Sequence, residues 1–243
     1  MHRRHRKLIV GLGTALAALA VAGIAYAAMN VTFSATMSPN RANKPTALSV
    51  NIASSDDTPG ALQPPIMTRI VMKLPGGTYN ASKFPRCKLA ALQAKGPKGC
   101  PSGAKIGTGT GIGLARPVVE DPVNGKLTVF NGARQGGKDT VLVYVFPDLG
   151  PTFVSVGKVI RSGSRYTLDF NVPPIKTLPN APDASVTSVK TKTPVKRIRK
   201  GSRKYYLIIA PRRCSGTWKG SGTFYFATGE KKTVKISQKC KKR

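Results

Sequence analysis

Alternation of apolar and polar residues begins near residue 31 and predicts β-strands along most of the chain. Residues 31–37 and 48–52 alternate strictly, as strands with one buried face do. Residues 66–74 are more continuously apolar and stop at the turn Pro75-Gly76-Gly77. Further strands are predicted at residues 104–114, 126–130, 140–146, 152–160 and 165–172. Turn-forming pairs such as Asn124-Gly125 and Gly136-Gly137 punctuate this pattern.

Residues 84–96 differ in composition from these strands. Proline stands near the start of this segment, alanine and leucine fill it, and Gly96 follows. This order of residues predicts one short helix.

The last third of the chain predicts two hairpins after a proline-rich interval at residues 172–183. The first hairpin is expected to pair residues 185–199 with 205–211, and the second to pair 220–227 with 232–239. Residues 205–210 are apolar at successive positions, which indicates a central strand.

Many short strands with regular turns predict an all-β fold, with antiparallel sheets in a sandwich or jelly-roll-like arrangement and one short helix. Residues 28–243 are expected to form a single β-sandwich domain. A division of this domain near residues 173–184 is the alternative.

The N-terminal residues 1–27 have the organisation of a secretory signal peptide. Residues 1–7 carry four fixed positive charges, residues 8–25 are apolar or small, and Ala25-Tyr26-Ala27 matches a cleavage site. A signal helix that is cleaved from a secreted or cell-surface protein is therefore expected. The alternative is a retained anchor, although the apolar stretch is slightly shorter than the roughly 20 residues of a spanning helix. Membrane contact is expected only through this segment before cleavage.

The four cysteines, Cys87, Cys100, Cys214 and Cys240, are an even number in a chain expected to be exported, which indicates two disulfides. Of the three connectivities, the spacing favours Cys87–Cys100 with Cys214–Cys240, because each pair then closes a compact local unit. A zinc site is the alternative, but neither pair has the usual spacing of two to four residues.

Both histidines, His2 and His5, lie in the expected signal segment. The expected mature chain therefore lacks histidine, which excludes Ser-His-Asp and Cys-His nucleophile systems and the usual catalytic zinc sets. No cofactor is expected, and we expect a protein that is not an enzyme.

The glycine-rich run at residues 106–113 and two Ser-x-x-Lys matches carry little chemical information. The run lacks the G-x-G-x-x-G spacing of dinucleotide-binding loops, and the matches at Ser102 and Ser155 lack the partner motifs of penicillin-recognising enzymes. Structural roles in strands are expected for both features.

Several turn and bridge positions form a recurring set: Cys100-Pro followed by Lys105-Ile-Gly-Thr-Gly, the preceding Leu74-Pro-Gly-Gly, the strand from Pro122 to Leu127, and the basic hairpin that leads into Cys214. These positions resemble those of uncharacterised exported proteins of high-GC Gram-positive bacteria. The resemblance touches most of residues 66–240. It implies export and a β-rich fold, and it implies no activity.

Charge is the clearest non-random feature. The formal net charge is +31, and removal of the four basic residues of the signal segment lowers it to +27. Basic residues concentrate in the C-terminal part, where Glu230 is the one acid after residue 184. The candidate polyanion-binding residues are Lys190, Lys192, Lys196, Arg197, Arg199, Lys200, Arg203, Lys204, Arg212 and Arg213. On a hairpin, Lys190, Lys192 and Lys196 are expected to share one face and Arg197 and Arg199 the other.

These observations leave three hypotheses. The first is a non-enzymatic exported protein that binds anionic cell-surface polymers or other polyanions by charge, since such a field concentrates polyanions. Sequence-specific nucleic-acid binding is not expected, because no sequence-reading motif such as an RRM or a helix-turn-helix is present.

The second hypothesis is a carboxylate-based hydrolase of a surface glycan, which requires two facing acids among the nine scattered ones. The third is a structural surface module whose charge serves solubility. The oligomeric state is not predicted.

Overall fold

The computed structural model describes residues 29–177 and 182–242. The expected signal segment, residues 1–27, lies outside the described residues. The described chain is all-β with one short α-helix, as the strand pattern predicts.

Strands make up most of the described chain. They are β1 (Met29–Ser38), β2 (Ala47–Asp56), β3 (Met67–Leu74), β4 (Thr78–Tyr79), β5 (Lys105–Ala115), β6 (Val119–Gln135), β7 (Lys138–Pro147), β8 (Phe153–Ser162), β9 (Arg165–Asn171), β10 (Ser185–Thr193), β11 (Arg197–Lys200), β12 (Arg203–Tyr206), β13 (Ile208–Ile209), β14 (Thr217–Phe226) and β15 (Lys231–Lys239). The helix α1 (Leu89–Lys95) and the short 3-10 turns η1 (Ala81–Lys83), η2 (Gly96–Gly99) and η3 (Ser102–Ala104) lie between β4 and β5.

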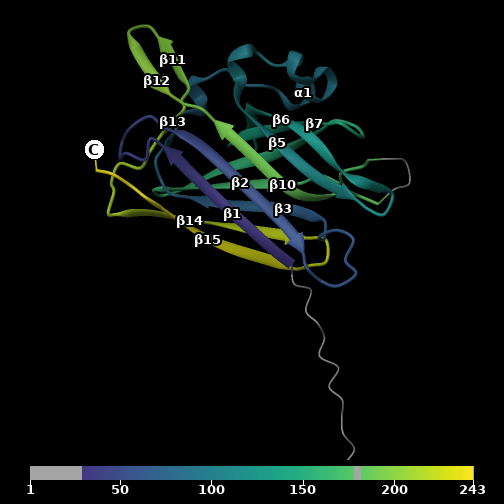
Figure 1. The fold of residues 1–243 in the computed structure, drawn as a ribbon. Coiled ribbons are helices and arrows are strands. Elements are labelled where there is room, and N and C mark those ends of the chain that lie inside the picture. The colour runs from purple at the N-terminus through teal and green to yellow at the C-terminus, as the bar shows by residue number, and fades with distance from the viewer. Residues whose placement is uncertain (1–28, 178–181, 243) are drawn as a thin grey trace, which may run out of the picture.

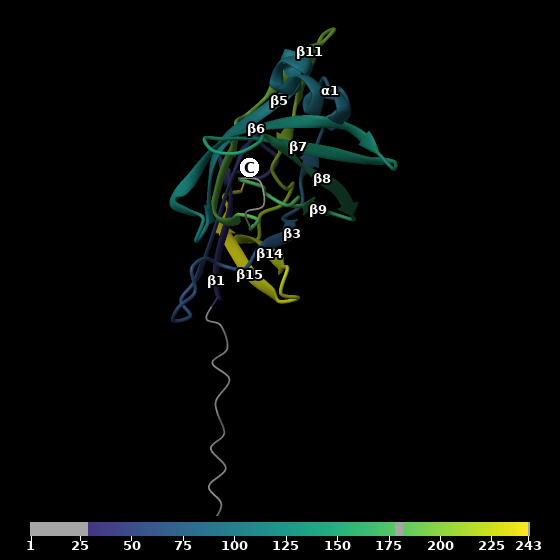
Figure 2. The same cartoon turned by 90° about the vertical axis from the view of Figure 1, so that its right-hand side faces the viewer.

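One 11-stranded antiparallel sheet forms the body of the molecule. Its order is β1-β2-β10-β5-β6-β7-β8-β9-β3-β14-β15. Figure 2 shows these strands following one another around the interior, from β5 and β6 through β9 and β3 to β14 and β15. The strands on either side of residues 173–184 therefore share this sheet, since β10 lies between β2 and β5 and β14 lies beside β3.

The two ends of the sheet order, β1 and β15, meet and nearly close the sheet. The side chain of Gln238 accepts a hydrogen bond from the Met37 amide at 2.8 Å and donates one to the Met37 carbonyl at 2.7 Å. The Lys241 amide donates to the Asn40 carbonyl at 2.8 Å. The two layers of the sandwich-like body are thus facing parts of one continuous sheet.

The core lies between the two layers. Phe33 of β1 packs edge-on against Phe224 of β14, with ring centroids 5.8 Å apart. A side chain at Gly222 would come within 2.8 Å of the Phe33 ring, so this close approach requires glycine. Aromatic pairs in this geometry stabilise a core beyond the area that they bury.

Both disulfides have the pairing that the spacing favours, Cys87–Cys100 and Cys214–Cys240. The first closes the segment that carries α1 on itself, and Cys87 joins this segment to β6 through its backbone, since its amide donates to the Asn131 carbonyl at 2.9 Å. Cys87 and Leu92 are fully buried there with Leu142. The predicted short helix is therefore confirmed.

The predicted first hairpin is wrong in its extent. Residues 185–193 form β10 inside the large sheet, paired with β2 and β5. Only β11 and β12, residues 197–206, form a hairpin. Pro194 directly follows β10 and lacks the N–H that a continuing ladder needs, which separates the two pairings.

The predicted central strand at residues 205–210 is also wrong. Residues 205–206 end β12, and residues 208–209 form β13, which pairs with β4 outside the large sheet. This segment is apolar at successive positions because it crosses one end of the sheet. There Leu207 is fully buried and packs with the main core. The second predicted hairpin, β14 with β15, is confirmed.

Candidate functional site

The antiparallel order sends the loops of the large sheet to two opposite ends. One end holds the loops at residues 39–46, 75–104 and 194–216, the turns at 136–137 and 163–164 and the last residues after β15, and we call it the basic end. The other holds the loops at residues 57–66, 116–118, 148–152, 172–184 and 227–230, and we call it the acidic end. In Figure 1 the β11–β12 hairpin and the C-terminus mark the basic end.

Most acidic side chains lie in the loops and strand tips of the acidic end. They are Asp56, Asp57, Glu120, Asp121, Asp148, Asp183 and Glu230, which leaves Asp139 and Asp169 of the nine acids in the chain. Asp169 lies on the outer face of β9 and forms an ion pair with Arg69, with 2.7 Å between nitrogen and oxygen. The basic end therefore holds Asp139 as its one acid.

Basic side chains from several separate segments gather at the basic end. They are Arg41, Lys44, Lys83, Arg86, Lys88, Lys95, Lys98, Lys105, Arg134, Lys138, Arg161, Arg165, Lys196, Arg197, Arg199, Lys200, Arg203, Lys204, Arg212, Arg213, Lys239, Lys241 and Lys242. Since charges of one sign at one end add to a single field, this end attracts anions over a distance set by ionic strength.

The β11–β12 hairpin carries the densest part of this charge. Arg199 lies opposite Lys204, and Lys200 lies opposite Arg203. All four side chains are exposed. Like charges at directly opposite positions destabilise a strand pair, so the hairpin holds an arrangement that a bound anion would stabilise.

Apolar and polar contacts hold the base of the hairpin to the body. Ile198 packs against the main core. The Lys83 ammonium lies 5.2 Å from the centre of the Tyr205 ring, and the Asn80 side-chain amide donates to the Tyr206 carbonyl at 2.7 Å. These contacts fix where the hairpin projects beyond the sheet.

Lys196 stands where the hairpin joins the body. Its ammonium donates a hydrogen bond to the Lys105 carbonyl. Burial lowers the pKa of Lys196 below its ordinary value, and the neighbouring Lys105 charge lowers it further. Lys196 thus adds charge to the site and also ties the start of β11 to the start of β5.

The structure separates Lys190 and Lys192 from the other predicted residues. Both project from the outer face of β10, beside Thr110 and Thr108 of β5. The expectation that they share a face with Lys196 is wrong, because Lys196 lies beyond the end of β10 in the loop before β11.

Arg212 and Arg213 lie in the loop that precedes Cys214, at the basic end. The Trp218 indole donates to the Arg213 carbonyl at 3.1 Å, and the Cys214–Cys240 bridge ties this loop to the end of β15. Within the described residues, none of the ten predicted basic side chains forms an ion pair with a carboxylate.

Sequence reasoning missed the basic residues that reach this end from other loops, such as Arg41, Lys44 and Arg165. They are single charges far apart along the chain, and no local pattern marks them. Only the antiparallel order of the sheet brings them to the same end as the hairpin.

None of the nine acids lines the interior hollow or the shallow hollow beside Pro75, Arg165 and Trp218. In the part of the chain that the structure describes, no three histidine, cysteine or acidic residues gather as a metal site would require.

Across residues 29–177 and 182–242, no helix has the length and apolar character needed to cross a membrane.

Comparison with known proteins gives no relative: no family model, curated protein or solved structure matches this chain.

Proposed function

We propose that this chain is an exported, non-enzymatic β-sandwich protein that associates through its basic end with anionic polymers. Candidate partners are cell-wall polymers, acidic polysaccharides and extracellular nucleic acids bound without sequence preference. The observation that carries the proposal is the β11–β12 hairpin, where exposed like charges lie opposite each other without a carboxylate partner among the described residues.

The export part of the proposal is supported by the cysteines. Two disulfides are typical of an oxidising, extracytoplasmic compartment. The signal-like residues 1–27 point the same way.

Binding by charge would work through the release of counterions. A polyanion that meets several Lys and Arg side chains loses condensed cations, and its affinity then falls steeply as salt rises. The acidic end, where seven of the nine carboxylates lie with Arg116, Lys176, Lys231 and Lys232, has no such excess of positive charge. The polymer is therefore expected to contact the molecule at one end.

The test compares two variants that lose the same charge at different places. The hairpin variant replaces six residues by glutamine, namely Lys196, Arg197, Arg199, Lys200, Arg203 and Lys204. The matched control replaces six exposed lysines of the strands, namely Lys73, Lys126, Lys158, Lys219, Lys231 and Lys235.

Both variants and the wild type are eluted from immobilised heparin, and from immobilised mixed-sequence single-stranded DNA, with a salt gradient. We expect the hairpin variant to elute at clearly lower salt than the control. Equal elution of both variants would mean that net charge alone governs retention. Wild-type retention that persists at high salt, or no retention at all, would also contradict the proposal, and the latter would favour a structural surface module.

A further inference from the structure

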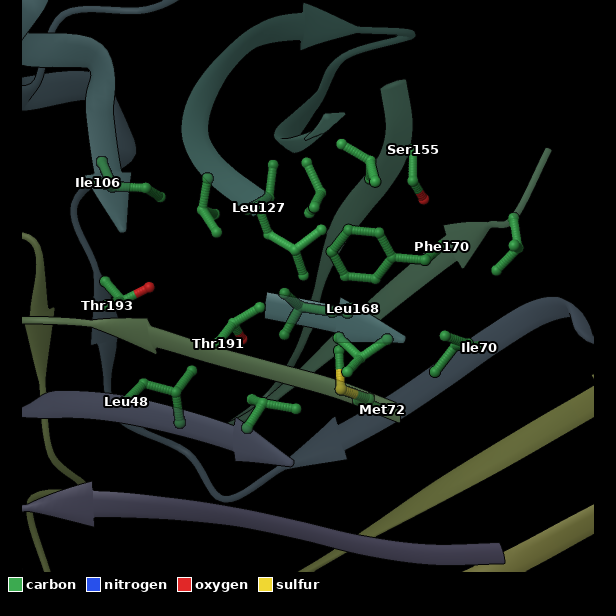
Figure 3. A pocket seen from close by; sticks show the side chains of 18 of the residues that line it. Leu48, Ile70, Met72, Ile106, Leu127, Ser155, Leu168, Phe170, Thr191 and Thr193 are labelled. Carbon is green, nitrogen blue, oxygen red and sulfur yellow. The ribbon is translucent and has the colours of Figure 1, made fainter. Parts of the chain in front are cut away.

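The interior of the nearly closed sheet contains a hollow of about 240 Å³. The inner faces of β2, β3 and β5 to β10 supply most of its wall. Figure 3 shows Leu48, Met72, Leu127 and Phe170 pointing into it from both layers. Protein interiors are close-packed and rarely leave space for more than a few waters, so a hollow of this size is unusual.

The lining is apolar and carries no charged side chain. Several of its hydroxyl groups already have partners within the protein. Ser155 Oγ donates to the Asn171 carbonyl at 2.8 Å, and the Tyr79 hydroxyl lies 3.3 Å from Asn131 Oδ1. The Tyr166 hydroxyl accepts from the Tyr79 amide at 3.3 Å. Because a buried water needs two to four polar partners, this space suits hydrocarbon better than water.

Two glycines in the wall keep the hollow open. Gly111 of β5 and Gly125 of β6 are paired in the sheet and have ordinary extended backbone. A methyl group at Gly111 would lie 3.5 Å or more from its neighbours, and one at Gly125 would lie 3.4 Å from Val145. By contrast, one at Gly109 would come within 2.2 Å of the Lys190 carbonyl oxygen. Neither Gly111 nor Gly125 is thus required by backbone conformation or by close packing.

We infer that this hollow is a binding site for an aliphatic hydrocarbon chain, such as the acyl chain of a lipid. Branched aliphatic side chains and Met72 dominate the lining, and they can pack around a flexible chain. The lining holds none of the basic residues of the β11–β12 hairpin, so this site is independent of the polyanion proposal.

The test uses an uncharged probe, so that the basic surface cannot bind it by charge. The fluorescent dye phenylnaphthylamine is titrated into the whole mature protein at about 0.5 M salt, where surface charges are screened. We expect saturable binding of one dye per chain and its displacement by dodecanol. Absence of saturable binding, or no displacement by dodecanol, would overturn the inference.

Filling variants locate the site. Gly111→Val with Gly125→Val, and separately Leu127→Phe, add volume inside the hollow, and Thr110→Val is the matched control on the outer face of β5. Folding is checked by thermal unfolding, and whichever filling variant folds is used. We expect about tenfold weaker dye binding or more in the filling variants, because hydrophobic pockets discriminate on this scale, and no change in the control. Unchanged affinity in a folded filling variant would overturn the assignment to the hollow. Loss of heparin retention would not affect this result, so the two proposals fail separately.

Discussion

Arg199 on β11 lies directly opposite Lys204 on β12, and neither forms an ion pair with a carboxylate within the described residues. The neighbouring pair, Lys200 with Arg203, repeats the arrangement. Two successive like-charge pairs at a hairpin tip reduce the stability of the strand pairing. The basic side chains of the two strands therefore repel one another, and their combined positive charge attracts anions.

Replacing Lys204 by glutamate is expected to strengthen the hairpin while weakening its retention on heparin. The new carboxylate faces Arg199, so an attractive cross-strand pair replaces a repulsive one. Amide hydrogen exchange in β11 and β12 is expected to slow by a factor of about two to five. Lys235→Glu is the control, because Lys235 of β15 lies opposite Ser221 and gains no such partner. Faster exchange in Lys204→Glu would contradict the assigned register.

Removal of the Cys87–Cys100 bridge is expected to lower the free energy of unfolding by about 2–4 kcal/mol. Cys87 is fully buried, where it packs with Leu92 and Phe130, and the bridge ties Cys100 at the end of the α1 segment to this buried position. Denaturant unfolding of Cys87→Ser with Cys100→Ser measures the effect. Under mild reduction of the wild type, the Cys214–Cys240 bridge is expected to be reduced before Cys87–Cys100, because Cys214 and Cys240 are both partly exposed. Earlier reduction of Cys87–Cys100 would contradict this order.

The Arg69–Asp169 ion pair predicts a dependence of stability on acid pH. The hydrogen bond from Arg69 lowers the pKa of Asp169 below its ordinary value, against a smaller opposing effect of burial. A lowered pKa in the folded state contributes stability above the pKa of the unfolded chain, near 4, and loses it as pH falls through the folded value. The difference in unfolding free energy between wild type and Asp169→Asn should therefore shrink from pH 6 toward pH 2.5.

Asp121→Asn is the matched control for this measurement, since Asp121 is exposed and forms no ion pair in the described part of the chain. Arg69 is exposed and Asp169 is partly buried, so the effect should be modest and should weaken in salt. A difference that stays constant across this pH range would show that Asp169 acts through packing rather than charge.

Asn131→Ala is expected to be among the most damaging single changes in the chain. Asn131 of β6 is fully buried, and its side-chain nitrogen donates to the carbonyls of Ala81 at 3.0 Å and Pro85 at 2.9 Å. Its side-chain oxygen lies 3.3 Å from the Tyr79 hydroxyl, which donates to it. Truncation leaves these buried groups without partners, at about 1–3 kcal/mol for each one.

Thermal or denaturant unfolding measures the effect of Asn131→Ala. Asn51→Ala, at an exposed position on β2, is the control and should change stability by less than about 0.5 kcal/mol. Equal effects of the two substitutions would show that Asn131 does not anchor residues 81–85 to the sheet.

Most strands could be predicted from the sequence alone, because the alternation of apolar and polar residues within a strand indicates that one of its faces is buried. The alternation at residues 31–37 and 48–52 corresponds to β1 and β2, each with one buried face. The helix α1, which lies within the predicted residues 84–96, and the β14–β15 hairpin follow from equally local patterns. The failures at residues 185–199 and 205–210 have one cause. Apolar residues there are buried by elements distant in sequence, and local periodicity does not reveal which ones.

Some features of the candidate site could likewise be predicted from the sequence, and others could not. The excess of basic residues after residue 184 is visible in the printed sequence, and so is the β11–β12 turn. The gathering of Arg41, Lys44 and Arg165 beside that hairpin is not, and neither is the hollow between the layers. Both depend on how the antiparallel strands are ordered around the interior.

By itself, the sequence determined the all-β class, the short helix, the cysteine pairing favoured by spacing, and the concentration of positive charge toward the C-terminal part. These features depend on periodicity, composition and short-range spacing, which are properties of neighbouring residues. Only the tertiary structure decided that one sheet turns back on itself, that most acids lie at one end while many bases gather at the other, and that an apolar hollow remains inside. These depend on long-range strand pairing, such as β10 between β2 and β5, where the free energy of burial selects partners that lie far apart along the chain.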